Sequence, residues 1–131
     1  MIFVDTSFWV AARLRRDEHH EHALALLRRL ADEGLFTSNH VRGETWTFLR
    51  RRDGHRSAVA FLDMLERTPR VRVIPVNDDH ERQALRWLRC HDEREYSFVD
   101  ATSFVLMESL GLRQALAFDG DFAAAGFVEI R

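Results

Sequence analysis

The first seven residues constrain the fold of this chain more than any other stretch. Residues 2–4 (Ile-Phe-Val) are consecutive apolar residues without polar alternation, which is typical of a strand covered on both faces, as in a parallel sheet between helices. The run ends at Asp5, and Thr6 and Ser7 predict the N-cap of a helix beginning near residue 8. An acidic side chain is therefore expected at the junction of a central strand and a helix, the edge where open α/β sheets bind ligands.

Helix and strand patterns alternate along the rest of the chain. Helical periodicity and capping residues predict helices at residues 8–14, 21–32, 40–52, 56–66, 81–90 and 97–110, with a helical turn at 122–125. Short apolar runs predict further strands at residues 35–37, 71–76, 115–118 and 127–130. Strands separated by helices favour a mostly parallel central sheet in a three-layer α/β/α sandwich. At 131 residues and 46% hydrophobic, the chain is expected to form one domain, residues 1–131.

Composition limits the classes of partner and compartment. The formal net charge is −2, so binding to nucleic acid would need a local cluster of arginines rather than a global positive field. Cys90 is the only cysteine, which excludes an internal disulfide and fits a reducing compartment. No signal peptide and no apolar run of membrane-spanning length is present. We therefore expect a soluble, cytoplasmic protein that does not enter a membrane.

Two acidic residues stand at the ends of predicted strands. Asp5 ends the first strand, and Asp119 follows the apolar run at residues 115–118. Neighbouring strands lie only about 4.8 Å apart. If these two strands are adjacent in the sheet, both carboxylates project into the same small volume.

Two further acids lie on predicted helices. Glu44 has Val41 three residues before it and Phe48 four residues after it, so its side chain is expected to share their face and point toward packed structure. Asp100 lies near the start of a helix that is apolar almost all round, which is typical of a buried helix. Both carboxylates are thus candidates for an interior acidic site.

Each acid also has a purely structural interpretation. Asp5 and Asp119 could cap the helices that follow them, Ser97 and Asp100 have the spacing of a capping box, and Glu44 could pair with an arginine. The structural interpretations explain the four acids less well when they are considered together. Buried carboxylates that lie close together repel one another unless a cation joins them. Oxygen ligands without histidine or cysteine suit Mg²⁺ or Mn²⁺. Such a site is suited to phosphodiester hydrolysis by an activated water.

With these residues in place, the chain resembles the PIN-domain ribonucleases, and most closely the VapC-like toxins of prokaryotic toxin–antitoxin pairs. The resemblance spans essentially the whole chain and rests on residues 4–7 (Val-Asp-Thr-Ser), Glu44, residues 97–101 (Ser-Phe-Val-Asp-Ala) and residues 117–122 (Ala-Phe-Asp-Gly-Asp-Phe). It implies an α/β/α sandwich, RNA cleavage dependent on Mg²⁺ or Mn²⁺, a homodimer, and inhibition by a small antitoxin protein.

The resemblance also implies roles for individual residues. The catalytic, metal-holding acids would be Asp5, Glu44, Asp100 and Asp119. Asp121 is either a further acid at the rim or the cap of the turn at residues 122–125. Thr6 and Ser7 lie beside the site and are candidates for substrate contact. The nucleophile is expected to be a metal-activated water, with no covalent enzyme intermediate.

The sequence contains two other polar clusters that are candidates for function. Arg50 and Arg51 belong to an arginine run at the end of the helix that carries Glu44; cations suit a helix C-terminus, and they are also candidates for contact with RNA phosphates. His19, His20 and His22 resemble a second metal site, although the solvated start of a helix explains them more simply.

Two alternative functions remain open from the sequence. One is a catalytically idle PIN-like module that acts by binding protein or RNA, and it predicts no stabilisation by metal. The other is an aspartate-phosphorylating or receiver-like domain. That alternative is disfavoured because position 7 is serine, where the hydrolase version needs a second aspartate, and because the chain contains no lysine.

Overall fold

Five parallel strands form one central sheet in the computed structural model, which describes residues 1–131. Their order across the sheet is β3-β2-β1-β4-β5. The strands are β1 (Ile2–Val4), β2 (Leu35–Ser38), β3 (Val71–Ile74), β4 (Gln114–Leu116) and β5 (Val128–Glu129). This arrangement confirms the predicted parallel sheet. It also makes the strand that precedes Asp5 a direct neighbour of the strand that precedes Asp119, with Val4 in register with Leu116.

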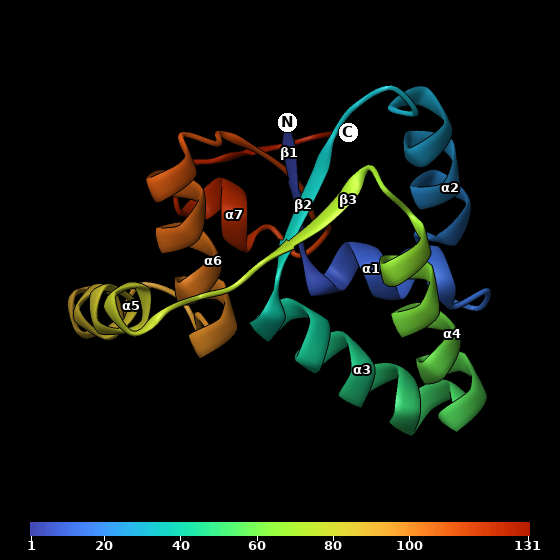
Figure 1. Ribbon diagram of the computed structural model, residues 1–131. Helices are drawn as coiled ribbons and strands as arrows, with labels where there is room; N and C mark the ends of the chain where they lie inside the picture. Colours follow the sequence, from blue (N-terminus) through green and yellow to red (C-terminus); the bar gives the residue numbers. More distant parts are fainter.

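Seven helices surround the sheet (Figure 1). They are α1 (Thr6–Arg13), α2 (His20–Arg29), α3 (Asn39–Asp53), α4 (His55–Arg67), α5 (Asp78–Cys90), α6 (Phe98–Leu110) and α7 (Asp121–Ala124). In Figure 1, α5, α6 and α7 lie on one side of the strands, and α1, α2 and α4 lie on the other. The predicted three-layer sandwich is thereby confirmed. None of these helices combines the length and the apolar character needed to cross a bilayer.

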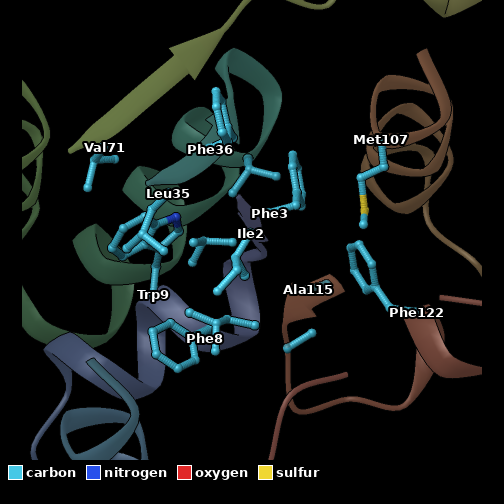
Figure 2. Packing of buried hydrophobic residues seen from close by; sticks show 14 of the residues in the cluster. Ile2, Phe3, Phe8, Trp9, Leu35, Phe36, Val71, Met107, Ala115 and Phe122 are labelled. Atoms are coloured by element: carbon cyan, nitrogen blue, oxygen red, sulfur yellow. The ribbon is translucent and has the colours of Figure 1, made fainter. Parts of the chain in front are cut away.

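The core lies on both faces of β1. Ile2, Phe3 and Val4 are at most 1% exposed, and alternate side chains of a strand point to opposite faces. Figure 2 shows Phe3 on the side of Met107 and Phe122, and Ile2 on the opposite side, toward Phe8 and Trp9. The uninterrupted apolar run at the start of the chain is therefore explained by burial on both sides of a central strand.

Capping residues define where three of the helices start. The N-cap of α1 is Asp5, as its structural interpretation allowed, so the helix begins at Thr6 and not near residue 8. A carboxylate at this position accepts from a free backbone amide of the first turn, as a serine or threonine would. At α5 the N-cap is Asn77, which forms a capping box with His80. The capping box predicted for Ser97 and Asp100 is present.

Candidate metal centre

Asp5 occupies the most buried position among the predicted acids. Its residue is 2% exposed, and its Oδ2 accepts hydrogen bonds from the backbone amide of Ser7 at 3.2 Å and from the Ser7 hydroxyl at 2.9 Å. The same hydroxyl accepts from the backbone amide of Phe118 at 3.0 Å. Ser7 therefore fixes the orientation of Asp5 and ties the end of β1 to the segment that follows β4.

Three further carboxylates converge beside this position. Asp100, Asp119 and Asp121 each offer an oxygen within 4.8 Å of the others. Asp100 is 7% exposed, whereas Asp119 is exposed and Asp121 is half-buried. The Asp100 Oδ2 accepts from the Ser97 amide at 2.9 Å, and the Asp119 Oδ1 accepts from the Asp121 amide at 3.1 Å. Asp100 and Asp119 can therefore accept from backbone amides and still offer an oxygen to the cluster, because each hydrogen bond engages only one of the two oxygens of a carboxylate.

Electrostatics links Asp5 to this trio. Burial, followed by repulsion from Asp119, raises the pKa of Asp5 from 3.8 to about 8. Burial, together with the charges of Asp121 and Asp119, raises the pKa of Asp100 to about 6. The pKa of Asp119 is also raised, because its carboxyl is partly desolvated by its neighbours and is repelled by Asp121 and Glu129. The carboxyls of Asp5, Asp100 and Asp119 therefore favour the protonated form unless a cation is present.

Arg94 is the cation that faces this cluster. Its Nε donates to Asp121 Oδ1 at 2.6 Å, and its Nη2 donates to the backbone carbonyl of Asp119 at 3.1 Å. Arg94 could not be predicted from the sequence, because residues 91–96 are a polar stretch that carries no motif. Nearby, the Tyr96 hydroxyl is buried without a hydrogen-bond partner. Burial raises the pKa of Tyr96, and Asp121 and Asp100 add to that effect.

Glu44 does not point inward as expected. The buried residues of α3 are Val41, Thr45 and Leu49, at helical spacing, while Glu44 is exposed. The neighbour used to orient it, Phe48, is itself only half-buried. Because the buried stripe of α3 is centred on Thr45, Glu44 falls on its solvent-facing flank. It is also absent from the trio of converging carboxylates.

A family model for the PIN domain matches residues 2–128. The chain belongs to the PIN-domain family. The family predicted from the four acids and their spacing is therefore confirmed.

Named relatives are similar over the full length of this PIN domain. The 23S rRNA-specific endonuclease VapC20 of Mycobacterium tuberculosis is 56% identical over 131 residues, covering 100% of this chain and 98% of the relative. A crystal structure of M. tuberculosis VapC20, described as a sarcin-ricin loop cleaving toxin, superimposes with a TM-score of 0.91 at 54% identity, covering 100% of this chain and 99% of that one. FitAcB from Neisseria gonorrhoeae has a TM-score of 0.70 at 19% identity, over 100% of this chain and 97% of that chain, and supports the fold alone.

The donor set of this PIN domain fits a hard divalent cation. All ligands brought together are carboxylate oxygens, and neither histidine nor cysteine joins the cluster. Mg²⁺ and Mn²⁺ favour such ligands. In addition, the Thr6 hydroxyl is buried beside Asp5 without a hydrogen-bond partner. Asp100, Asp119 and Asp121 thus meet at one edge of the sheet, and Asp5 lies close enough for the charges of Asp119 and Asp100 to raise its pKa.

The other predicted clusters contribute no ligand to the group of converging carboxylates. Arg50 and Arg51 are exposed on α3. The Nδ1 of His20 is hydrogen-bonded to the Ala11 carbonyl at 2.7 Å, and the only group of three or more metal-ligating side chains is the aspartate trio. The histidines therefore form no second metal cluster.

A groove leads away from the acids along α1. Its volume is about 360 Å³, and it is lined by Thr6, Ser7, Val10, Asp17, His19, Phe48, Phe118 and Asp119. The groove therefore combines two residues predicted for substrate contact, Thr6 and Ser7, with one acid of the centre, Asp119. Its aromatic lining was not apparent from the sequence.

Proposed function

We propose that this PIN domain is the toxin of a toxin–antitoxin pair and an endoribonuclease that hydrolyses RNA phosphodiester bonds with the help of Mg²⁺ or Mn²⁺. The observation that carries the proposal is the convergence of Asp100, Asp119 and Asp121 beside the buried Asp5, with raised pKa values for Asp5, Asp100 and Asp119. Carboxylates pressed together in this way are suited to hold a divalent cation.

In this proposal Asp5, Asp100 and Asp119 hold the ion, and Asp121 completes the set. A bound Mg²⁺ or Mn²⁺ lowers the pKa of water and stabilises charge on the phosphate. Ser7 keeps the Asp5 carboxylate oriented through its two hydrogen bonds. Arg94 holds Asp121 and balances part of the negative charge before the ion binds. Glu44, which is exposed on α3, stays a prediction as a metal-holding acid.

The substrate proposed for this chain is the sarcin-ricin loop of 23S rRNA. The support is the activity of VapC20, a 23S rRNA-specific endonuclease that cleaves the sarcin-ricin loop and is 56% identical over the whole length of this chain. Arg50 and Arg51 stay candidates for contact with the RNA backbone, since phosphate contacts position a protein on its target without reading sequence.

A cleavage assay tests the function directly. Ribosomes or 23S rRNA are incubated with the protein in Mg²⁺, Mn²⁺ or chelator, and cuts are mapped by primer extension. We expect one dominant cut in the sarcin-ricin loop that disappears with chelator. A cut elsewhere would refute the substrate. Absence of any cleavage together with absence of metal binding would favour an idle binding module.

Partners follow from the toxin assignment. We infer a cognate antitoxin, a homodimeric assembly and a cytoplasmic location, where ribosomal RNA is accessible. Co-expression with the product of a short reading frame adjacent to the gene should yield a stable complex that no longer cleaves RNA. Light scattering of the purified toxin should give twice the 15.4 kDa chain mass; a monomer would refute the homodimer without affecting the nuclease assignment.

A further inference from the structure

His19 has no role in the acidic centre, yet its ring is held in a defined place. It stacks on Phe118 with 4.5 Å between ring centroids and 8° between planes. Phe118 in turn stacks on Phe8 at 5.5 Å and 19°. Phe8 is fully buried, whereas 40% of the His19 side chain is exposed. The stack therefore anchors a surface ring to the hydrophobic core.

The exposed end of this stack lines the groove beside the acids. His19 and Asp17 come from the segment between α1 and α2, and Phe48 comes from α3. The groove volume of about 360 Å³ falls within the range of about 300–1,000 Å³ typical of small-ligand sites. Asp119 lines the same groove, so a ligand in it would lie next to the acidic centre.

Charge distinguishes this groove from a phosphate channel. Asp17 and Asp119 line it, and both carry carboxylates, which repel phosphate. At Phe48, which lines the groove, the guanidinium of Arg52 lies 4.8 Å from the centre of the ring. Arg16 donates a hydrogen bond to the Arg52 backbone carbonyl. An uncharged planar group inside the groove, with its phosphate toward these arginines, is therefore the best match.

We propose that this groove is the subsite for one unpaired RNA base next to the cleaved phosphate, and that His19 is the ring on which the base stacks. The inference rests on the proposed ribonuclease function. Specific recognition of RNA commonly splays unpaired bases onto aromatic side chains, histidine included. Asp17, which lines the same groove, accepts from the His19 amide through Oδ1 at 2.8 Å and so helps to hold the histidine in place.

A simpler explanation is that the stack only anchors the segment between α1 and α2 to the segment that follows β4, without binding a base. The two readings make different predictions. A fastening role changes stability alone, whereas a base subsite changes affinity for RNA at one nucleotide position. His22 provides a matched control, because its ring also contacts Phe118, at 5.6 Å and tilted by 50°, but it does not line this groove.

The test uses loop oligonucleotides with a single abasic nucleotide at each position around the cut. Binding is measured by fluorescence anisotropy in an Asp5→Asn background, which prevents cleavage. Loss of one stacked base should weaken binding about 5- to 150-fold. With His19 present, we expect one abasic position to weaken binding by this factor. With His19→Ala, we expect no abasic position to weaken binding. His19→Phe, which keeps a ring, should restore both the affinity and the sensitivity to the abasic site. His22→Ala should behave like the parent protein.

The outcomes separate the subsite from the function. If the abasic profile is the same with and without His19, or if His19→Ala lowers only the melting temperature, the subsite is refuted while RNA cleavage stands. If the parent protein neither binds nor cleaves any RNA, the proposed function fails, and the subsite fails with it.

Discussion

At the scale of single residues, the acidic centre depends on a carboxylate that water does not reach. Asp5 is buried beside Asp119 and Asp100, and its main hydrogen bonds come from Ser7. These bonds favour the charged form, but burial and neighbouring charge oppose it more strongly, because the pKa rises to about 8. The site therefore has a high affinity for any positive charge, whether a proton or a metal ion.

Replacing Asp5 by Asn should abolish RNA cleavage while stabilising the metal-free protein. The amide cannot carry the charge that burial penalises, and each unit of pKa shift corresponds to about 1.4 kcal/mol. We expect a gain in unfolding free energy of up to about 6 kcal/mol near pH 8, because the pKa rises from 3.8 to about 8, and a loss of cleavage of at least about 100-fold. Urea denaturation and cleavage rates measure these effects. Asp32→Asn, at an exposed position outside the acidic cluster, should change neither. Wild-type cleavage by Asp5→Asn would refute the metal-site assignment.

The stability of the metal-free protein should fall as pH rises. A folded-state pKa above the unfolded value means that the folded protein binds more protons, so its extra stability is present below pH 3.8 and is lost as pH approaches about 8 for Asp5 and about 6 for Asp100. Thermal melts in chelator between pH 5 and 9 should show a declining melting temperature, and the decline should be shallower in Asp5→Asn. A flat profile in both proteins would show that the acids do not interact.

At the scale of elements, the turn between β4 and α7 sets the distance between two of the acids. Gly120 has a φ of 82° and separates Asp119 from Asp121. Its Cα faces Arg94, whose Nη2 lies 3.2 Å from the place a Cβ would take. The turn therefore needs glycine for its backbone conformation and for the close approach of the arginine.

Gly120→Ala should weaken both stability and metal binding. A left-handed conformation costs a residue with a Cβ roughly 1–2 kcal/mol, and displacement of Arg94 alters the Asp119–Asp121 spacing. Gly111→Ala is the matched control, because Gly111 also has a positive φ, of 68°, but has nothing within 4 Å of its added Cβ. Denaturation should show similar losses for both variants, whereas calorimetric titration with Mn²⁺ should show weaker binding only for Gly120→Ala. Equal metal affinities would contradict a role for this turn in shaping the site.

At the scale of the whole molecule, the acids connect elements that are distant along the chain. Asp5 follows β1, Asp100 lies on α6, and Asp119 follows β4, so three separate segments meet at one edge of the sheet. A divalent ion held by all three would join them only in the folded state. Metal binding is therefore expected to be coupled to global stability.

Millimolar Mg²⁺ or Mn²⁺ should raise the melting temperature relative to chelator. A ligand that binds only the folded state at 100 times its Kd adds about 2.7 kcal/mol. The shift should grow between pH 6 and 8, because protons and the ion compete for Asp5 and Asp100, and it should vanish in Asp100→Asn. Differential scanning fluorimetry suffices as the measurement. An unchanged melting temperature at every metal concentration would argue for the idle binding module.

Local sequence determined where the helices and strands form and which acids stand at their ends. The apolar run before Asp5 specified a strand buried on both faces, and Ser97 with Asp100 specified the start of α6, because capping and periodicity act over a few residues. Tertiary structure alone decided that β4 lies beside β1, that Arg94 reaches Asp121, that His19 stacks on Phe118, and that Glu44 faces water. These outcomes depend on which strands pair and how each helix is rotated against the core, and both are set by packing between residues far apart in the chain.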